Sequence, residues 1–304
     1  MTLIRRRERT PAQSASSLSE LSPEDYRTLV NEVDRCLRSL GAQRVDIDGS
    51  VVHTDRFGDF GLTNLARTLR LSPHARWSDL IQAQLTAIAH GSQGHAPLAD
   101  LRSIIMPRLL CGDFGLPFQV PSWAKQAGAG LFYVAAVDHP DTIELRVAES
   151  ELPDGWGRLW DDALTNLRRL GVPEQGQIRV PSSTAIVHFF AGDIFGASRL
   201  AIIDDLLADI EPDCGWGLIA SVPCSSTLFV HVVKDQELLA AINYLVPRTG
   251  DMYSAQPGAL SPWLYYRRDA ASSWEQVTRM AEDGNGTIVR PPEAIYPLLQ
   301  KSLK

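Results

Sequence analysis

The spacing of hydrophobic residues predicts six helices. In each one, apolar side chains recur every three or four residues, which places them on the side of a helix that faces a core. Ser22 precedes the first stretch, Pro23 opens it and Gly41 follows it, an arrangement typical of a capped helix with a glycine stop. Pro212 and Pro247 are expected beyond the ends of two later helices. The predicted helices span residues 23–40, 77–88, 159–170, 200–210, 236–245 and 273–280.

Alternation of apolar and polar residues predicts strands between these helices. Residues 45–53 are expected to form a hairpin around Asp48-Gly49, and a second hairpin is expected around residues 138–141. The Gly-Asp-Phe-Gly sequences at 58–61 and 112–115 are interpreted as loop turns. Hairpins mixed with helices indicate an α+β fold with a mixed sheet and packed helices. The other predicted strands cover residues 131–137, 142–147, 184–190, 216–222, 227–233 and 263–267.

One phrase of the sequence occurs twice. The nine residues from Val180 to His188 return, with one residue added, between Val222 and His231. Each copy is a polar turn that leads into a β-branched, alternating run, and each is followed by a helix-like segment. The repeat predicts two similar strand–helix units, whose strands could lie side by side with both histidines at the same end.

Changes in composition divide the chain. Residues 92–97 resemble a linker, which predicts a small helix and hairpin module before them and a larger α+β domain after them. The polar N-terminal stretch is expected to be a flexible tail, and a C-terminal helix and tail are expected to pack on the main domain. The predicted parts are residues 1–21, 22–95, 96–270 and 271–304.

Composition excludes several classes of protein. The 304 residues carry a net charge of −7, with no basic stripe, which argues against nucleic acid as the main partner. No apolar run approaches the roughly 20 residues of a membrane helix, and the four cysteines lack the spacing of a zinc site or a disulfide framework. We expect a cytoplasmic protein without a cofactor that binds neither nucleic acid nor a membrane.

The segment from Gly192 to Leu200 is the first candidate site. A loop between a strand and a helix is a frequent place for ligands. Asp193 could accept a hydrogen bond, Arg199 could hold a carboxylate or phosphate, and Ser198 lies near a helix N-terminus. The structural alternative is that Ser198 caps the helix and Arg199 pairs with an aspartate.

His188 and His231 form the second candidate. On adjacent strands in register, both imidazoles would share one end of a sheet and could join Asp193 or Asp235 in a metal site. The structural alternative is two half-buried histidines with backbone partners. Nucleophile motifs are absent, because no glycine elbow surrounds the serines after Pro181 and Pro223.

Several phrases resemble the YtpQ-like bacterial proteins. These are Trp156 with the helix segment 162–168, the Gly192–Leu200 segment with its Ala-Ser-Arg-Leu, and the strand 220–223 that ends in proline. Looser similarity lies at 61–65 and 104–108, so the resemblance spans roughly residues 50–270. Where the family has arginine and aspartate after that proline, this chain has Cys224-Ser-Ser-Thr227. The resemblance implies an intracellular bacterial protein and supplies no reaction.

Two functional hypotheses follow. The first is a non-catalytic binding or accessory protein whose partner is another protein; aromatic residues, enriched at interfaces, include seven tryptophans here. The second is a small-molecule enzyme or ligand-binding domain that uses the Gly192–Arg199 loop for an anionic ligand.

Overall fold

The computed structural model describes residues 21–91, 102–112, 120–139, 142–146, 155–157, 159–212, 215–235, 237–281 and 286–297. The chain divides into two compact units, residues 1–94 and 95–304. The expected tail and the second Gly-Asp-Phe-Gly sequence lie almost entirely outside the described residues.

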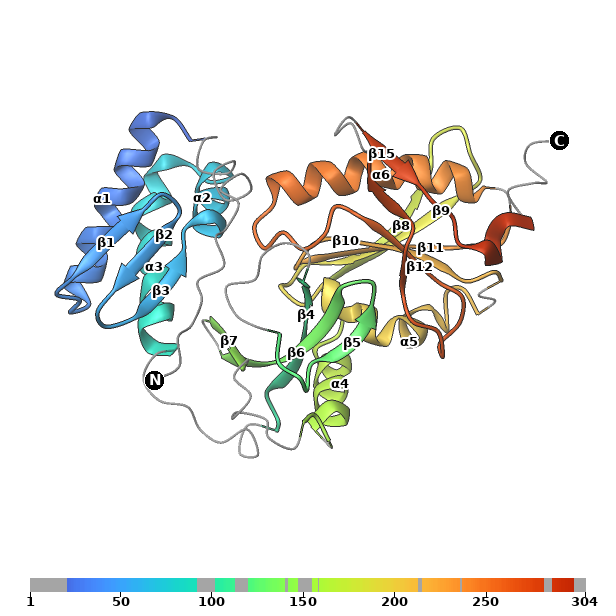
Figure 1. Ribbon diagram of the computed structural model, residues 1–304, viewed down its shortest axis with the longest axis horizontal. Helices are drawn as coiled ribbons and strands as arrows, with labels where there is room; N and C mark the ends of the chain where they lie inside the picture. The colour runs from blue at the N-terminus through green and yellow to red at the C-terminus, as the bar shows by residue number, and fades with distance from the viewer. Residues whose placement is uncertain are drawn as a thin grey trace, which may run out of the picture. The chain divides into compact units, whose positions relative to one another are not determined.

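The N-terminal unit combines three helices with a small antiparallel sheet (Figure 1). The sheet order is β1-β2-β3, and Gly49, with a φ of 57°, forms the turn between the first two strands. The elements are α1 (Pro23–Ser39), β1 (Val45–Asp48), β2 (Val51–Thr54), β3 (Gly58–Gly61), α2 (Thr63–Arg70), the 3₁₀ helix η1 (His74–Arg76) and α3 (Trp77–Gly91).

Apolar residues from all three α-helices fill the core of this unit. The expected cap is present, because the Ser22 side chain accepts a hydrogen bond of 3.0 Å from the backbone N–H of Asp25. Trp77 is buried, and its Nε1 donates to the carbonyl oxygen of Leu69 at 3.0 Å, which ties α3 to the end of α2. The other core residues include Leu29, Val33, Leu37, Val52, Leu65, Ile81 and Leu85.

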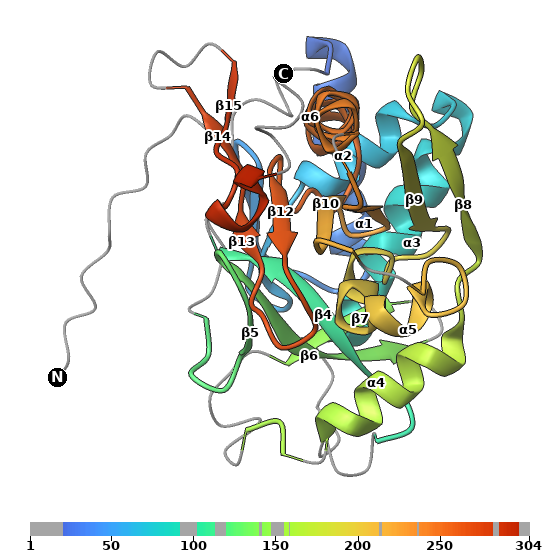
Figure 2. The same ribbon diagram turned by 90° about the vertical axis from the view of Figure 1, so that its right-hand side faces the viewer.

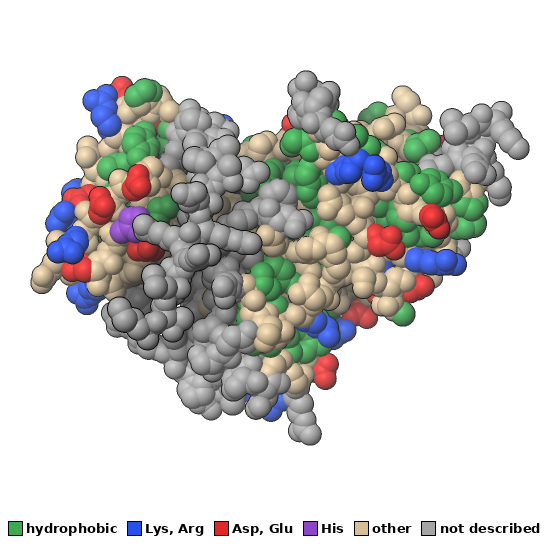
Figure 3. Space-filling model, in the orientation of Figure 1, with side chains coloured by type: hydrophobic (Ala, Val, Ile, Leu, Met, Phe, Trp, Pro, Cys, Tyr) green, Lys and Arg blue, Asp and Glu red, His purple; other side chains and the backbone are tan. Residues whose placement is uncertain are grey.

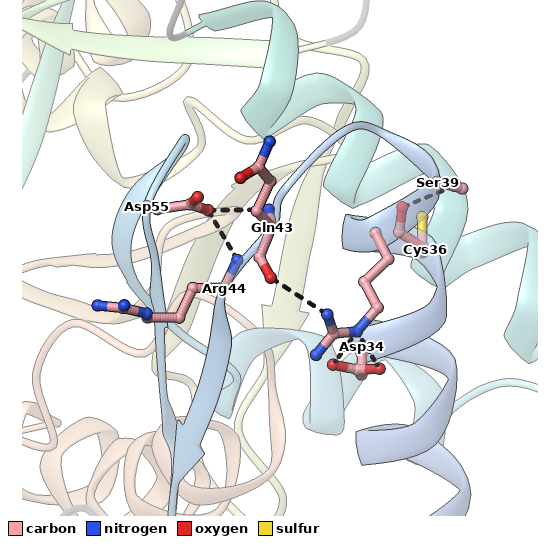
Figure 4. A network of polar contacts seen from close by, with 7 residues as sticks. Asp34, Cys36, Ser39, Gln43, Arg44 and Asp55 are labelled. Carbon is pink, nitrogen blue, oxygen red and sulfur yellow. Dashed lines mark hydrogen bonds and ion pairs between the residues drawn. The ribbon is translucent and has the colours of Figure 1, made fainter.

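A polar network joins the end of α1 to the sheet (Figure 4). Arg38 donates through Nε to both carboxylate oxygens of Asp34 and through Nη1 to the carbonyl oxygen of Gln43 at 3.3 Å. Asp55 accepts from the backbone N–H groups of Gln43 and Arg44, each at 3.1 Å. These backbone donors hold the pKa of Asp55 below its ordinary value. The network fixes where β1 begins after α1.

The described part of the second unit contains two larger antiparallel sheets and one two-stranded hairpin. The larger has the order β13-β12-β10-β11-β9-β8, and the smaller has β4-β6-β5 with β7 paired to β6. The larger sheet consists of β8 (Glu174–Arg179), β9 (Ile186–Ala191), β10 (Leu218–Cys224), β11 (Thr227–Val232), β12 (Leu264–Arg267) and β13 (Glu275–Gln276). The smaller consists of β4 (Ile105–Cys111), β5 (Lys125–Gly128), β6 (Leu131–His139) and β7 (Thr142–Arg146); β14 (Thr278–Met280) and β15 (Thr287–Val289) form a separate hairpin.

Helices cover these sheets in layers. Figures 1 and 2 show α6 (Leu238–Ala255) along one face of the larger sheet, with the smaller sheet, α4 (Leu159–Leu170) and α5 (Ile203–Leu207) on the other side. The 3₁₀ helix η5 (Ala197–Ile202) leads directly into α5, and η6 (Glu293–Ile295) lies near the C-terminus. These helices and sheets confirm the predicted α+β class. All pairings between the described strands are antiparallel, so the sheet is not mixed as expected.

Strict alternation along the strands builds one core on each face of the larger sheet. In β11, Leu228 and Val230 pack toward the smaller sheet, and Phe229 between them packs toward α6. In β10, Ala220 packs toward the smaller sheet and Ile219 packs toward α6. The strands are therefore buried on both faces, which explains why their apolar runs are nearly continuous.

The repeated phrase supplies the turn and second strand of two hairpins, β8–β9 and β10–β11. The two second strands are neighbours, because β9 pairs antiparallel with β11. Their ladder runs from Phe190, opposite Leu228, to His188, opposite Val230, and ends there. On its other side β9 stays paired with β8 as far as Ile186, opposite Arg179. Past His188, β9 and β11 are therefore no longer hydrogen-bonded strand to strand.

Three expected elements differ from the structure. Residues 58–61 form strand β3 rather than a loop turn, because their backbone pairs with β2. The helix expected over 200–210 is a 3₁₀ helix followed by five residues of α-helix. The helix expected over 273–280 is two short strands, so tertiary pairing outweighs the local periodicity there.

Pro247 lies inside α6 rather than beyond its end. Proline removes one backbone donor from a helix and usually ends it. Here Leu245 and Thr249, on either side of the proline, are both fully buried, and the Thr249 hydroxyl bonds the Ser221 hydroxyl of β10 at 2.7 Å. Packing against the sheet thus stabilises a helix that continues past the proline.

Two glycines give opposite predictions for stability. A Cβ on Gly196 would lie 2.1 Å from the carbonyl oxygen of Ser226, which is backbone and cannot move aside, whereas a Cβ on Gly250 would meet nothing within 4 Å. We expect Gly196→Ala to lower the free energy of unfolding by about 2 kcal/mol or more. Gly250→Ala, inside α6, should raise it by about 0.5–1 kcal/mol. Urea unfolding of both variants measures this, and equal effects would contradict the close approach at Gly196.

Candidate functional site

Arg199 lies at the centre of a buried polar cluster. Its side chain is 0 % exposed, and all three guanidinium nitrogens donate within the protein. Nη1 and Nη2 grip the two carboxylate oxygens of Asp193 at 2.6 and 2.5 Å, and Nε donates to the carbonyl oxygen of Gly171 at 3.0 Å. Nη2 also donates to that carbonyl. This planar, bidentate grip is the geometry in which arginine holds a carboxylate most strongly.

The other polar groups of the loop also form hydrogen bonds within the protein. Asp193 also accepts from the backbone N–H of Phe195 at 2.8 Å, and the Ser198 hydroxyl accepts from the N–H of Leu109 in β4 at 3.1 Å. Arg108 donates to the carbonyl of Ile194 and lies 5.8 Å from the Phe195 ring. Burial lowers the pKa of Arg108 to about 10.

The structure therefore brings Asp193, Ser198 and Arg199 together, as expected, but in an internal arrangement. Each polar group predicted to meet a ligand bonds the protein itself, and the guanidinium has no exposed surface. The structural alternative is confirmed for Arg199, which pairs with Asp193. It is wrong for Ser198, whose hydroxyl bonds β4 and does not cap the helix. An anionic ligand would have to displace Asp193 from a buried arginine, and breaking such a pair costs about 3–5 kcal/mol.

Asn166, in the helix segment similar to the YtpQ-like proteins, has a comparable role. It is buried, and its Nδ2 donates to the carbonyl oxygens of Arg102 at 2.8 Å and Ile105 at 3.0 Å. The side chain of α4 thus holds the start of β4. Both motif residues, Asn166 and Arg199, donate to backbone carbonyl oxygens of other segments.

The two histidines of the repeat line a cavity of about 130 Å³ beside the end of the β9–β11 ladder. His231 reaches across the gap, and its Nδ1 lies 2.8 Å from the carbonyl oxygen of Ile186. His188 lies with its Nε2 3.5 Å from Oε1 of Glu211. His188 is 1 % exposed and His231 is 5 % exposed. The structure confirms that the repeat strands are adjacent and brings both imidazoles to one cavity.

Charged side chains surround the histidines. Glu211 pairs through its other oxygen with the ammonium group of Lys234, and Glu237 accepts from the Ser183 hydroxyl. Asp235 accepts from the backbone N–H of Glu237 at 2.9 Å. The polar side chains that line the cavity include His188, Glu211, His231, Lys234, Asp235 and Glu237. Three carboxylates against one ammonium make the cavity electronegative.

Burial lowers the pKa of both histidines. For His188, loss of solvent is the main cause, and it outweighs the opposing effect of Glu211; nearby His231 and Lys234 lower the pKa further. For His231, loss of solvent outweighs its backbone hydrogen bond and the nearby carboxylates. Both imidazoles are therefore neutral at pH 7, because the ordinary pKa is near 6.5.

Three large, exposed apolar residues lie close to cavity-lining residues along the chain or through a backbone hydrogen bond. Ile210 precedes Glu211, and Leu239 lies two residues after Glu237. Trp216 donates its backbone N–H at 2.7 Å to the carbonyl of Val233, next to Lys234. The exposed fractions are 44 % for Ile210, 42 % for Trp216 and 37 % for Leu239. We call these three residues the apolar rim.

Sequence reasoning missed the acidic partners and the apolar rim. Glu211 and Lys234 follow a helix and a strand without any motif, and only the fold places them beside the histidines. The signal available was the repeat itself, because both copies end in a histidine. Asp235, considered as a metal ligand with them, does line the cavity, and Asp193 bonds Arg199 instead.

Other kinds of site have little support within the described parts of the chain. No group of three or more His, Cys, Asp or Glu residues is placed to hold a metal ion. No described helix is both long and apolar enough to cross a membrane. On the described part of the face in Figure 3, acidic and basic side chains are interspersed rather than gathered by sign.

Loss of Arg199 should destabilise the protein. Arg199→Met removes a fully buried guanidinium and leaves the partly buried Asp193 carboxylate and the Gly171 carbonyl without their donor, and we expect a loss of about 3 kcal/mol in the free energy of unfolding. Arg168→Met is the matched control, because Arg168 pairs with Asp205 where both are about half exposed, and such pairs contribute about 0–1 kcal/mol. Equal losses in urea unfolding would contradict a structural role for the Arg199 cluster.

The buried histidines should make stability depend on pH. Their folded pKa values lie below the ordinary 6.5, so the unfolded chain binds protons more readily as the pH falls below about 6.5. The free energy of unfolding should therefore decrease between about pH 7 and pH 5. His188→Gln should flatten this slope. An unaltered slope in His188→Gln would refute the assignment.

Comparisons with protein-family models, with curated proteins and with solved structures found no significant match. The similarity to the YtpQ-like proteins thus remains an expectation from the motifs. Function is inferred from the chemistry of the Arg199 cluster and of the His188–His231 cavity.

Proposed function

We propose that this protein is a non-catalytic binding protein that recognises another protein through the surface around the His188–His231 cavity. The observation that carries the proposal is the apolar rim. Three large apolar side chains are exposed on residues that lie next to or near cavity-lining residues along the chain or through a backbone hydrogen bond, and exposed apolar groups beside polar ones are typical of recognition surfaces.

The aromatic member of the rim is held in place. Trp216 has its N–H bonded to Val233, and its carbonyl oxygen accepts from the Tyr266 hydroxyl at 2.6 Å. Tyr266 is itself buried under α6. Both bonds are made by the backbone of Trp216, so the backbone at this residue is ordered before binding and loses less conformational freedom when a partner covers it. Exposed tryptophans often contribute a large share of the binding energy.

The Gly192–Arg199 loop supports this function indirectly. Arg199 belongs to η5, which continues through α5 to Glu211, and the N–H of Glu211 bonds the carbonyl of Leu207 at 2.8 Å. The buried ion pair with Asp193 therefore anchors the start of the segment that ends at the cavity. We propose a role for the loop in positioning rather than in binding an anion, and an intracellular bacterial setting in line with the resemblance to the YtpQ-like proteins.

The proposal predicts that the apolar rim holds the partner. We expect Trp216→Ala to reduce retention of a stoichiometric partner about tenfold or more, because truncation of such an anchor typically costs 2 kcal/mol or more of binding free energy. The measurement is quantitative affinity capture from the source cells with tagged wild type and variant. Met280→Ala is the control, since Met280 is 59 % exposed but lies in β14.

Two results would refute this proposal. One is a wild-type protein that retains no stoichiometric partner. The other is a partner retained equally by Trp216→Ala and Met280→Ala. Equal unfolding curves for wild type and Trp216→Ala are required for the comparison.

A further inference from the structure

The partners of the two histidines determine where their protons lie. A carbonyl oxygen can only accept, so Nδ1 of His231, at 2.8 Å from Ile186, carries the proton. A carboxylate also only accepts, so Nε2 of His188, facing Glu211, carries the proton. In the neutral rings the remaining nitrogens, Nε2 of His231 and Nδ1 of His188, are both lone-pair acceptors.

Neither of these acceptors has a donor among the described residues. Both atoms are also buried. Buried polar atoms are nearly always bonded, and an orphan usually indicates an occupant that supplies the missing group. Two orphaned acceptors on rings that line the same cavity call for an occupant with hydrogen-bond donors.

The charges that line the cavity further limit which class of ligand can occupy it. Glu211, Asp235 and Glu237 line the cavity against the single ammonium of Lys234. Lys234 is 45 % exposed and pairs with Glu211 at the cavity. A group that brings positive charge as well as N–H donors would match the carboxylates and the imidazole lone pairs at once.

We infer that the His188–His231 cavity binds an ammonium or guanidinium group. Its volume of about 130 Å³ is close to the roughly 150 Å³ that holds benzene in an engineered cavity, so it accommodates a small head group. A free amine or the side chain of a lysine or arginine could supply that group. The side-chain source rests on the proposed function, whereas binding of the group itself does not.

Other ligand classes fit less well. An anion would face three carboxylates and two lone pairs, and only Lys234 would attract it. A metal ion would use the same lone pairs, but no described group of three or more His, Cys, Asp or Glu residues is placed to hold one. The cavity thus favours a donor-bearing organic cation.

The first test measures binding to the purified full-length protein. Methylguanidinium and propylammonium are the probes, and tetramethylammonium, a cation without N–H donors, is the control. Saturation near 100 times the dissociation constant should raise the Tm by about 5–10 °C for a unit of this size. Tetramethylammonium and acetate should produce no comparable shift.

Two sets of variants should change the affinity for methylguanidinium in opposite directions. Glu211→Gln with Glu237→Gln removes two cavity charges while keeping side-chain size, and should weaken binding of methylguanidinium about tenfold or more. Lys234→Met removes the competing ammonium and should strengthen it several-fold. Glu275→Gln, an exposed carboxylate in β13, is the control and should leave the dissociation constant unchanged.

Several outcomes would overturn the inference. These are no stabilisation by either probe, equal stabilisation by tetramethylammonium, binding that persists in the double variant, or stabilisation by zinc but not by the amines. Partner capture then separates the sources: loss of the partner in the double variant indicates a lysine or arginine side chain, and its retention indicates a free amine. Failure of the proposed function would show instead as insensitivity of partner capture to Trp216→Ala.

Discussion

The β9–β11 ladder ends at the pair of His188 and Val230, and the candidate site depends on this break. β9 continues along β8, so the carbonyl of Ile186 no longer has a strand partner on the β11 side. The imidazole of His231 forms a hydrogen bond with that carbonyl oxygen through Nδ1. One lost strand pairing is thus replaced by a side-chain hydrogen bond, which satisfies the backbone and leaves space between the strands.

Burial on both faces of the larger sheet keeps this break local. The smaller sheet and α5 pack on one face and α6 on the other, so both strands are held on either side of the gap. The Arg199 cluster extends this support. It joins the end of α4 to the loop after β9, and η5 and α5 then lead to Glu211 beside the cavity. A buried ion pair with full hydrogen bonding serves here to position a segment.

Local patterns in the sequence predicted much of the fold and part of the site. The capped helix at Ser22, the hairpin at Gly49 and the β6–β7 hairpin follow from short-range rules, and the structure has them. The repeat pointed to both histidines. Tertiary contacts account for what the patterns missed. α6 continues past Pro247 because the helix packs on the sheet. Residues 273–280 pair as strands despite a helical pattern. Arg199 was recognised as important, but its burial, which decides its role, cannot be read from the loop sequence.

The protonation of His188 and His231 tests the account most directly. Nitrogen-15 chemical shifts of the imidazole rings distinguish the two neutral tautomers from each other and from the charged ring. At pH 7 the account predicts a neutral His231 with its proton on Nδ1 and a neutral His188 with its proton on Nε2. Each ring would then present a lone pair on its other nitrogen. The opposite tautomer in either ring, or a doubly protonated ring at pH 7, would contradict it.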